Sequence, residues 1–274
     1  MKKIVLAAVG VMLAATPALA EHKLLITDVL DQKQIEAQAT FEYTHLTSDL
    51  KSPEEHGKQT LNGTESNYSL GVGLGHGLEV TASIPYVFSE RDNTQFTGSE
   101  AEIEKRDGFG DFALQAKYLL LGGEEEKYAV VTGLGVKFDT AAKDDAGTGT
   151  TDISPFIAAS TKLGHHYTPY AIYRATLRNH DVQDTHTLSV GLEKQINETF
   201  TLDGKIDANF NTASDKVAAN EDFVFELSSY IQVAHNLYLL PSVAYLKGTD
   251  TTAEGVRISN TDGVRVGAAL YYLY

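Results

Sequence analysis

The chain contains no cysteine and no tryptophan, and it has few cations. Without cysteine, no disulfide framework can hold the fold together. Lys and Arg number 22 against 37 Asp and Glu, and this formal net charge of −15 disfavours nucleic acid as a partner. Beyond the N-terminal segment there is no run of about 20 apolar residues, and the mean hydropathy is −0.19. These two features exclude a helical membrane protein.

The N-terminal segment has the pattern of a secretory signal peptide. Lys2 and Lys3 form a short basic region, an apolar stretch follows, and Ala18-Leu19-Ala20 is a small-residue cleavage site before Glu21. We therefore expect residues 1–20 to be a signal peptide that is cleaved after Ala20. The mature chain is then exported and starts at Glu21.

Apolar residues occupy every second position of the last segment, from Val264 to the terminal Tyr274. The residues between them, such as Arg265 and Gly267, point to the other face of the strand. Such alternation, ending on an aromatic residue, is typical of the strands of outer-membrane β-barrels. The same alternation predicts further strands, several of them in pairs around tight turns. They lie at or within Ile35–Tyr43, Tyr68–Leu74, Leu78–Phe88, Phe112–Leu120, Tyr128–Phe138, the flanks of Gly164-His165-His166 and of Asn197-Glu198, Phe223–Val233, and the segment ending at Lys247.

About twelve strands result, and short and long connections alternate between them. Among the long connections are two polar loops, Ser89–Arg106 and Thr140–Thr151. We predict an all-β fold, a transmembrane antiparallel up-and-down β-barrel of residues 34–274 that the aromatic-ended C-terminal strand closes. The tight turns would face the periplasm and the longer connections the outside. Tyr and Phe, 14 and 11 in number, would supply the aromatic girdles.

Two features fit this barrel less well. Pro85, Pro155, Pro169 and Pro241 fall in or beside predicted strands, where each lacks the N–H of a ladder hydrogen bond, so some strands should be shorter or bulged. Residues 21–33 show no strand alternation. They are either a frayed periplasmic leader or a segment that folds into the lumen as a partial plug.

The string from Gly71 to Phe88, GVGLGHGLEVTASIPYVF, is followed by GFGDFALQAKYLLL and YAVVTGLGVKFDT. These hairpins resemble the outer-membrane family named for a role in the meta-pathway of phenol degradation, although Phe138-Asp139-Thr140-Ala141 departs from its Pro-Thr-Gly pattern. The resemblance implies a channel for small solutes, among them aromatic or hydrophobic compounds.

A barrel of this size should leave a narrow lumen, because smaller barrels fill with side chains and larger ones hold an open pore. Small inward residues such as Gly71 and Gly133 leave room. Inward charges would either form a self-neutralising network or select solutes, and Lys117 with Lys137 could attract a carboxylate. The candidate lumen-lining residues are Asp111, Lys117, Lys137, Arg174, Asp203, Lys205, Asp207, Glu226 and Arg265.

Other functions are weighed against the channel. A structural or surface-interaction barrel would have a filled lumen and act through its loops. A lipid-modifying enzyme would need His45, His180 and His186, with Asp181 and Asp184, to converge at the rim, but no nucleophile motif accompanies them. We therefore predict no enzymatic activity.

The sequence gives only weak indications of a metal site or a pH-sensing site. The turn histidines His76, His165, His166 and His235 could form a titrating ring or a weak metal site, but exposed turns also tolerate histidine. The acidic run Asp139, Asp144, Asp145 and Asp152 lacks the spacing of a calcium loop and is interpreted as solvated. We expect no cofactor and no metal. The expected partners are outer-membrane lipid and lipopolysaccharide, the assembly machinery that recognises the strand ending at Tyr274, and a small solute.

Overall fold

The structure, a computed structural model, describes residues 25–123, 126–142, 146–164, 166–180, 182–197 and 199–274, so the predicted signal peptide lies outside the described residues. No helix in these ranges is long and apolar enough to cross a membrane. The strands are β1 Ile35–Lys51, β2 His56–Gly75, β3 Leu78–Phe96, β4 Glu102–Phe109, β5 Ala113–Gly122, β6 Tyr128–Lys137, β7 Asp152–Thr161, β8 Tyr167–Arg178, β9 Thr185–Asn197, β10 Phe200–Asn211, β11 Asn220–Ala234, β12 Leu237–Gly248, β13 Thr251–Ala253 and β14 Val256–Leu273.

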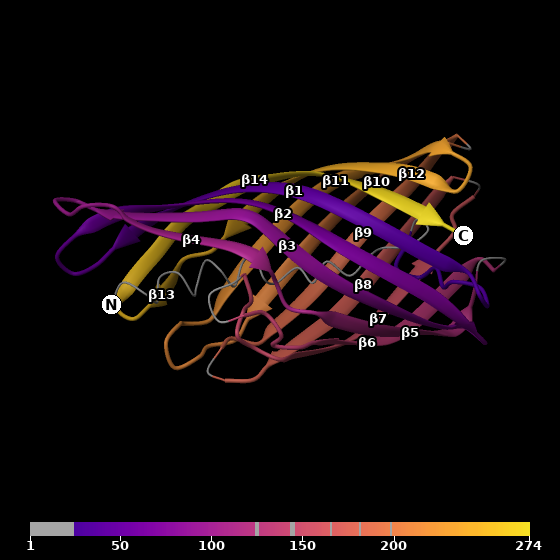
Figure 1. Cartoon of the computed structure of the whole chain (residues 1–274), viewed down its shortest axis with the longest axis horizontal. Helices are drawn as coiled ribbons and strands as arrows, with labels where there is room; N and C mark the ends of the chain where they lie inside the picture. The colour runs from indigo at the N-terminus through magenta and orange to yellow at the C-terminus, as the bar shows by residue number, and fades with distance from the viewer. Residues whose placement is uncertain (1–24, 124–125, 143–145, 165, 181, 198) are drawn as a thin grey trace.

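Twelve of these strands form a closed antiparallel barrel (Figure 1), which confirms the predicted fold class. Each wall strand pairs with the next one along the chain, and β14 returns to pair with β1. Two hydrogen bonds between the backbones of Ile35 and Tyr274 tie the ends of this seam. The two remaining strands are additions, β4 beside β3 and β13 beside β14.

The barrel is apolar outside and polar inside, the reverse of a soluble protein. Leu70, Phe109 and Leu270 have more than half of their surface exposed, at 57%, 54% and 52%. The inner face instead buries charged side chains, such as Glu79 and Lys117 with 1% exposure each. An exposed apolar belt on every wall strand matches a lipid environment.

Four strands continue beyond the apolar belt and form an extension of the barrel wall, visible at the left of Figure 1. The extension comprises the outer parts of β1, β2, β3 and β14, with β4 and β13. The predicted loop Ser89–Arg106 was therefore wrong in part, because β3 runs on to Phe96 and β4 begins at Glu102.

The side-chain pattern inverts where the extension begins. On β1 the apolar Phe41 and Tyr43 face outward, whereas further along the apolar Leu46 and Leu50 are buried inside, with 1% exposure each. Leu50 packs with Val217, Ala253, Val256 and Ile258. Beyond the lipid, the outer face meets water and the inner face holds the apolar core.

All four strand prolines lie where a neighbouring ladder is interrupted. Pro85 falls between the last β3–β5 pair at Ser83 and the first β3–β4 pair at Tyr86. Pro155 and Pro241 fall in gaps of the β7–β8 and β11–β12 ladders, and Pro169 lies past the last β7–β8 pair. The missing N–H of each proline thus coincides with a gap in a ladder.

Candidate functional site

The N-terminal segment of the described chain, residues 25–33, lies inside the barrel at the tight-turn end. The Leu30 backbone N–H donates to Glu79 Oε2 at 3.0 Å. Lys117 Nζ donates to the Asp28 carbonyl at 2.5 Å and lies 3.5 Å from the same Glu79 oxygen. Two buried charges from β3 and β5 therefore hold the backbone of this segment, which we call the plug segment.

The plug segment also covers an apolar patch on the lumen wall. Leu25 and Ile26 pack against Val131 on β6, Phe156 and Ala158 on β7, and Tyr170 and Ile172 on β8. The Thr27 and Ser160 hydroxyls lie 2.8 Å apart, which fixes the segment against β7. If the plug segment left, this apolar patch on β6, β7 and β8 would be uncovered.

A group of charged side chains on β10, β11, β14 and β1, which we call the central ring, lies midway along the lumen wall and is partly exposed. Arg265 on β14 contacts Glu226 at 3.1 Å and Glu42 at 3.9 Å, and Lys205 contacts Asp207 at 3.6 Å and Glu226 at 3.9 Å. The side chains of Arg265, Glu226 and Glu42 keep 11%, 19% and 21% of their surface exposed. Side chains therefore do not fill this part of the lumen completely.

Carboxylates crowd one side of this ring. Glu42 on β1 and Glu65 on β2 are directly opposite each other, and Glu90 on β3 lies near Glu65. Glu65 is exposed although it shares the inner face with Glu42 and Arg265. Like charges at directly opposed positions repel, so this arrangement favours a bound or passing cation over an anion.

A second network lies at the other end of the lumen wall, at the long connections. Lys137 Nζ lies 3.1 Å from Asp152 and 3.7 Å from Asp111, and Arg178 Nε lies 3.5 Å from the same Asp152 oxygen. Asp111 accepts hydrogen bonds from the backbones of Thr140, Ala141 and Thr148, so the connection between β6 and β7 is held against the barrel.

The structure thus places the nine candidate lumen residues in three groups. Lys117 lies under the plug segment, and Lys137 with Asp111 lies at the opposite network. Lys205, Asp207, Glu226 and Arg265 share the central ring. The two remaining candidates, Arg174 and Asp203, contact aromatic residues of the lumen wall. The Arg174 guanidinium is 5.2 Å from the Phe156 ring centre, and the Tyr170 hydroxyl donates to Asp203 at 3.0 Å.

The hypothesis that Lys117 and Lys137 attract a carboxylate together was wrong. The two lysines lie at different heights of the lumen, because Lys117 pairs with Gly133 midway along β6 whereas Lys137 pairs with Ala113 at the end of β6. Gly133 and Lys137 are four residues apart, roughly 13 Å along β6. Each lysine already contacts a carboxylate of the protein.

The histidines proposed for an enzyme do not converge. His45 on β1 hydrogen-bonds Asn62, and His186 on β9 hydrogen-bonds the Tyr173 hydroxyl. β1 and β9 are not neighbours in the sheet. His180 occupies a turn with a φ of 64°, and Asp181 lies outside the described residues.

Within the described ranges, no group of three or more His, Asp or Glu could hold a metal ion. Of the turn histidines, His165 lies outside these ranges, and so do Asp144 and Asp145 of the acidic run. Asp152 was wrongly interpreted as solvated, since it is 5% exposed and bound to Lys137 and Arg178.

Several residues of the lumen escaped the sequence analysis. Glu42, Glu65, Glu79 and Glu90 are not among the candidates, although Glu42 between Phe41 and Tyr43 and Glu79 between Leu78 and Val80 alternate with apolar residues. This alternation would have predicted that Glu42 and Glu79 face the lumen. The bulge at Phe88, opposite Thr64 and Glu65, shifts the phase of β3 before Glu90.

Comparison with solved structures supports the fold. An outer membrane channel from Pseudomonas putida F1 is similar with a TM-score of 0.69 and 12% identity, over 91% of this chain and 98% of that one. A KdgM porin in complex with disordered oligogalacturonate is similar with a TM-score of 0.50 and 10% identity, over 84% of this chain and 97% of that one. At such identities the likeness shows an outer-membrane barrel fold alone.

Comparison of sequences finds a similarity over part of the chain only. No curated protein matches the chain. The model of the family described as "Putative MetA-pathway of phenol degradation" matches residues 44–171, which include the hairpins from Gly71 to Phe138. The chain therefore is an outer-membrane β-barrel that carries the sequence pattern of this family over residues 44–171, which confirms the resemblance.

Proposed function

We propose that the protein is an outer-membrane channel for the passive diffusion of small solutes. The observation that carries this proposal is the central ring of charged side chains, which stay partly exposed inside a closed barrel. A lumen filled for structural purposes alone would bury these charges. The plug segment and the network around Lys137 narrow the path on either side of the ring.

The solute class follows from the wall. Carboxylates outnumber cations on the inner face, so anionic solutes are disfavoured. The patch around Phe156 and Ile172 would supply an apolar surface once the plug segment moves. We therefore propose small neutral or cationic solutes with an apolar part, in agreement with the aromatic or hydrophobic compounds that the family resemblance implies.

The setting of the channel is part of the proposal. The exposed apolar belt favours residence in the bacterial outer membrane, with the tight turns facing the periplasm. We propose cleavage after Ala20, and assembly by machinery that recognises β14 with its terminal Tyr274. The wide separation of His45 and His186 argues against the lipid-modifying enzyme.

Planar-bilayer recordings test the channel directly. The mature chain should give discrete conductance steps, and a variant lacking residues 21–33 should give steps at least about twofold larger, because the plug segment no longer narrows the lumen. Folding of both proteins is checked by heat-dependent migration in gels. If both insert as folded barrels and stay silent, the protein is a structural barrel with a filled lumen and the proposal is wrong.

A further inference from the structure

The outer face of the extension carries a row of basic and polar side chains directly above the aromatic girdle. Tyr43, Phe88 and Phe109 are exposed at the edge of the apolar belt. Continuing along the same strands, His45 lies opposite Asn62, Asn62 opposite Arg91, and Arg91 opposite Lys105. The row crosses β1, β2, β3 and β4 within a few residues of the girdle, at the height where aromatic rings meet lipid headgroups.

Two cations of this row face each other without compensation. Arg91 and Lys105 are register partners and both are exposed. In the described part of the chain neither cation forms an ion pair, although the exposed Asp107 lies two residues from Lys105 on the same face of β4. Directly opposed like charges destabilise a sheet. In a chain of net charge −15, such a pair is best explained by an anion that binds between the two side chains.

We propose that this row binds lipopolysaccharide, with a lipid A phosphate between Arg91 and Lys105. The guanidinium of Arg91 can donate two parallel hydrogen bonds to a phosphate, and the Lys105 ammonium adds a second charge. The extension lies on the side of the long connections, which faces the outer leaflet where this lipid resides. His45 and Asn62 continue the row with polar groups that suit the adjoining sugars.

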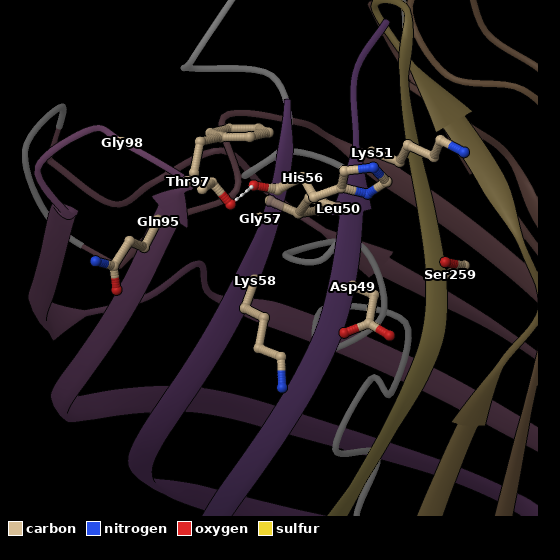
Figure 2. A pocket seen from close by; sticks show the side chains of 11 residues that line it. Asp49, Leu50, Lys51, His56, Gly57, Lys58, Gln95, Thr97, Gly98 and Ser259 are labelled. Carbon is tan, nitrogen blue, oxygen red and sulfur yellow. Dashed lines mark hydrogen bonds between the residues drawn. The ribbon is translucent and has the colours of Figure 1, made fainter. Parts of the chain in front are cut away.

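A groove farther out on the extension fits the same occupant (Figure 2). It has a volume of about 590 Å³, and Lys51, His56, Lys58 and Gln95 line it. Asp49, opposite Lys58, is hydrogen-bonded to Asn260 at 2.9 Å. Its two lysines suit the phosphorylated sugars that follow lipid A, and the apolar Leu50 and Phe96 also line it.

Binding of purified lipid A to the folded mature protein in a neutral detergent tests the proposal. The double variant Arg91→Gln/Lys105→Gln should bind bisphosphorylated lipid A about tenfold more weakly than the native chain. The matched control Lys127→Gln/Lys194→Gln removes two cations at the tight-turn end and should bind as the native chain does. Because the first variant relieves a repulsion, it should remain folded, which heat-dependent gel migration checks.

Two further ligands test whether binding depends on the phosphate and whether it is specific for lipid A. The native chain should bind dephosphorylated lipid A as weakly as the variant binds the phosphorylated form, and should bind phosphatidylglycerol more weakly than lipid A. Equal affinity of the Arg91→Gln/Lys105→Gln variant and the native chain would overturn the proposal. So would equal affinity for phosphatidylglycerol, which would show a general attraction to anionic lipid. Neither result bears on conductance, so this proposal and the channel fail independently.

Discussion

Asp92 shows how one residue of the extension responds to its surroundings. It lies on β3 beyond Phe88, the last exposed apolar residue of that strand, and therefore outside the lipid belt. Its carboxylate accepts a hydrogen bond from Gln59 Nε2 at 2.7 Å. Burial raises the pKa of Asp92 to about 6, the Gln59 hydrogen bond lowers it, and the neighbouring Glu90 and Glu104 add to the rise.

This raised pKa predicts a pH-dependent extension. Because the folded pKa lies above the unfolded value of 3.8, the contribution of Asp92 to stability is complete below that value and is lost as the pH rises through about 6. Asp92→Asn should abolish this loss, while Asp107→Asn, at an exposed position of β4, should leave it unchanged. An NMR titration of the Asp92 carboxyl carbon should have its midpoint near pH 6, and a midpoint near 4 would contradict the prediction.

The prolines show which residue-scale features the sequence could predict. The lost N–H of Pro85 and Pro155 predicts shortened or bulged strands, and both residues do lie at ladder interruptions. Which of the two neighbouring ladders is interrupted depends on the register, and the register depends on strands far away in the sequence. That information is not local, so it could not be predicted.

At the scale of elements, the lipid-facing strands were predictable and the extension was not. Alternation with the apolar face outward identifies a strand only where lipid covers that face. On β1 the pattern inverts between Tyr43 and Leu46, and on β3 beyond Phe88 the exposed residues are polar. The outer part of β3 therefore resembles a loop in composition, although cross-strand pairs with β2 and β4 hold it.

The candidate site was predictable to a similar extent. The alternation within each strand predicts that Lys205, Asp207, Glu226 and Arg265 point into the lumen. Their grouping into one ring depends on the tilt and stagger of the strands, which the sequence does not give. The position of residues 25–33 in the lumen depends on contacts with Glu79 and Lys117, far along the chain.

The plug segment can be tested as an element with a disulfide. The chain has no cysteine, and the hydroxyls of Thr27 and Ser160 are 2.8 Å apart, so Thr27→Cys/Ser160→Cys places two sulfur atoms within reach of a bond of about 2.0 Å. The oxidised variant should stay at the low conductance of the native chain and show fewer large openings than the same protein after reduction. Each single variant serves as a control for the added thiol. Failure of the pair to cross-link under oxidation would contradict the plug position.

At the scale of the whole molecule, the inner face carries an acidic surplus. Among the described residues the inward acids include Glu36, Glu42, Glu65, Glu79, Glu90, Asp92, Asp111, Asp152, Glu193, Asp203, Asp207, Asp222 and Glu226, and the inward cations include Arg106, Lys117, Lys137, Arg174, Arg178, Lys205 and Arg265. A narrow lumen with low-dielectric walls focuses such a field.

The channel should therefore prefer cations. In a salt gradient, the reversal potential should have the sign of cation selectivity, and Glu42→Gln/Glu65→Gln should lower the cation-to-anion permeability ratio by roughly half. Glu54→Gln/Glu55→Gln removes the same charge from the exposed β1–β2 turn and should have little effect. An equal change of the permeability ratio in both variants would show that the net charge of the protein, and not the central ring, determines the selectivity.

The seam between β1 and β14 sets the order in which the barrel can form. Its pairs join residues such as Ala37 and Tyr272, which are separated by nearly the whole chain. Every other wall contact can form between strands that are neighbours in the sequence, so the seam carries most of the loop-closure entropy. Until it forms, the sheet has two unpaired edges that can bind another chain. We therefore expect closure of the barrel to be the slow and aggregation-sensitive step of folding, and it cannot occur before the C-terminal strand β14 is in place.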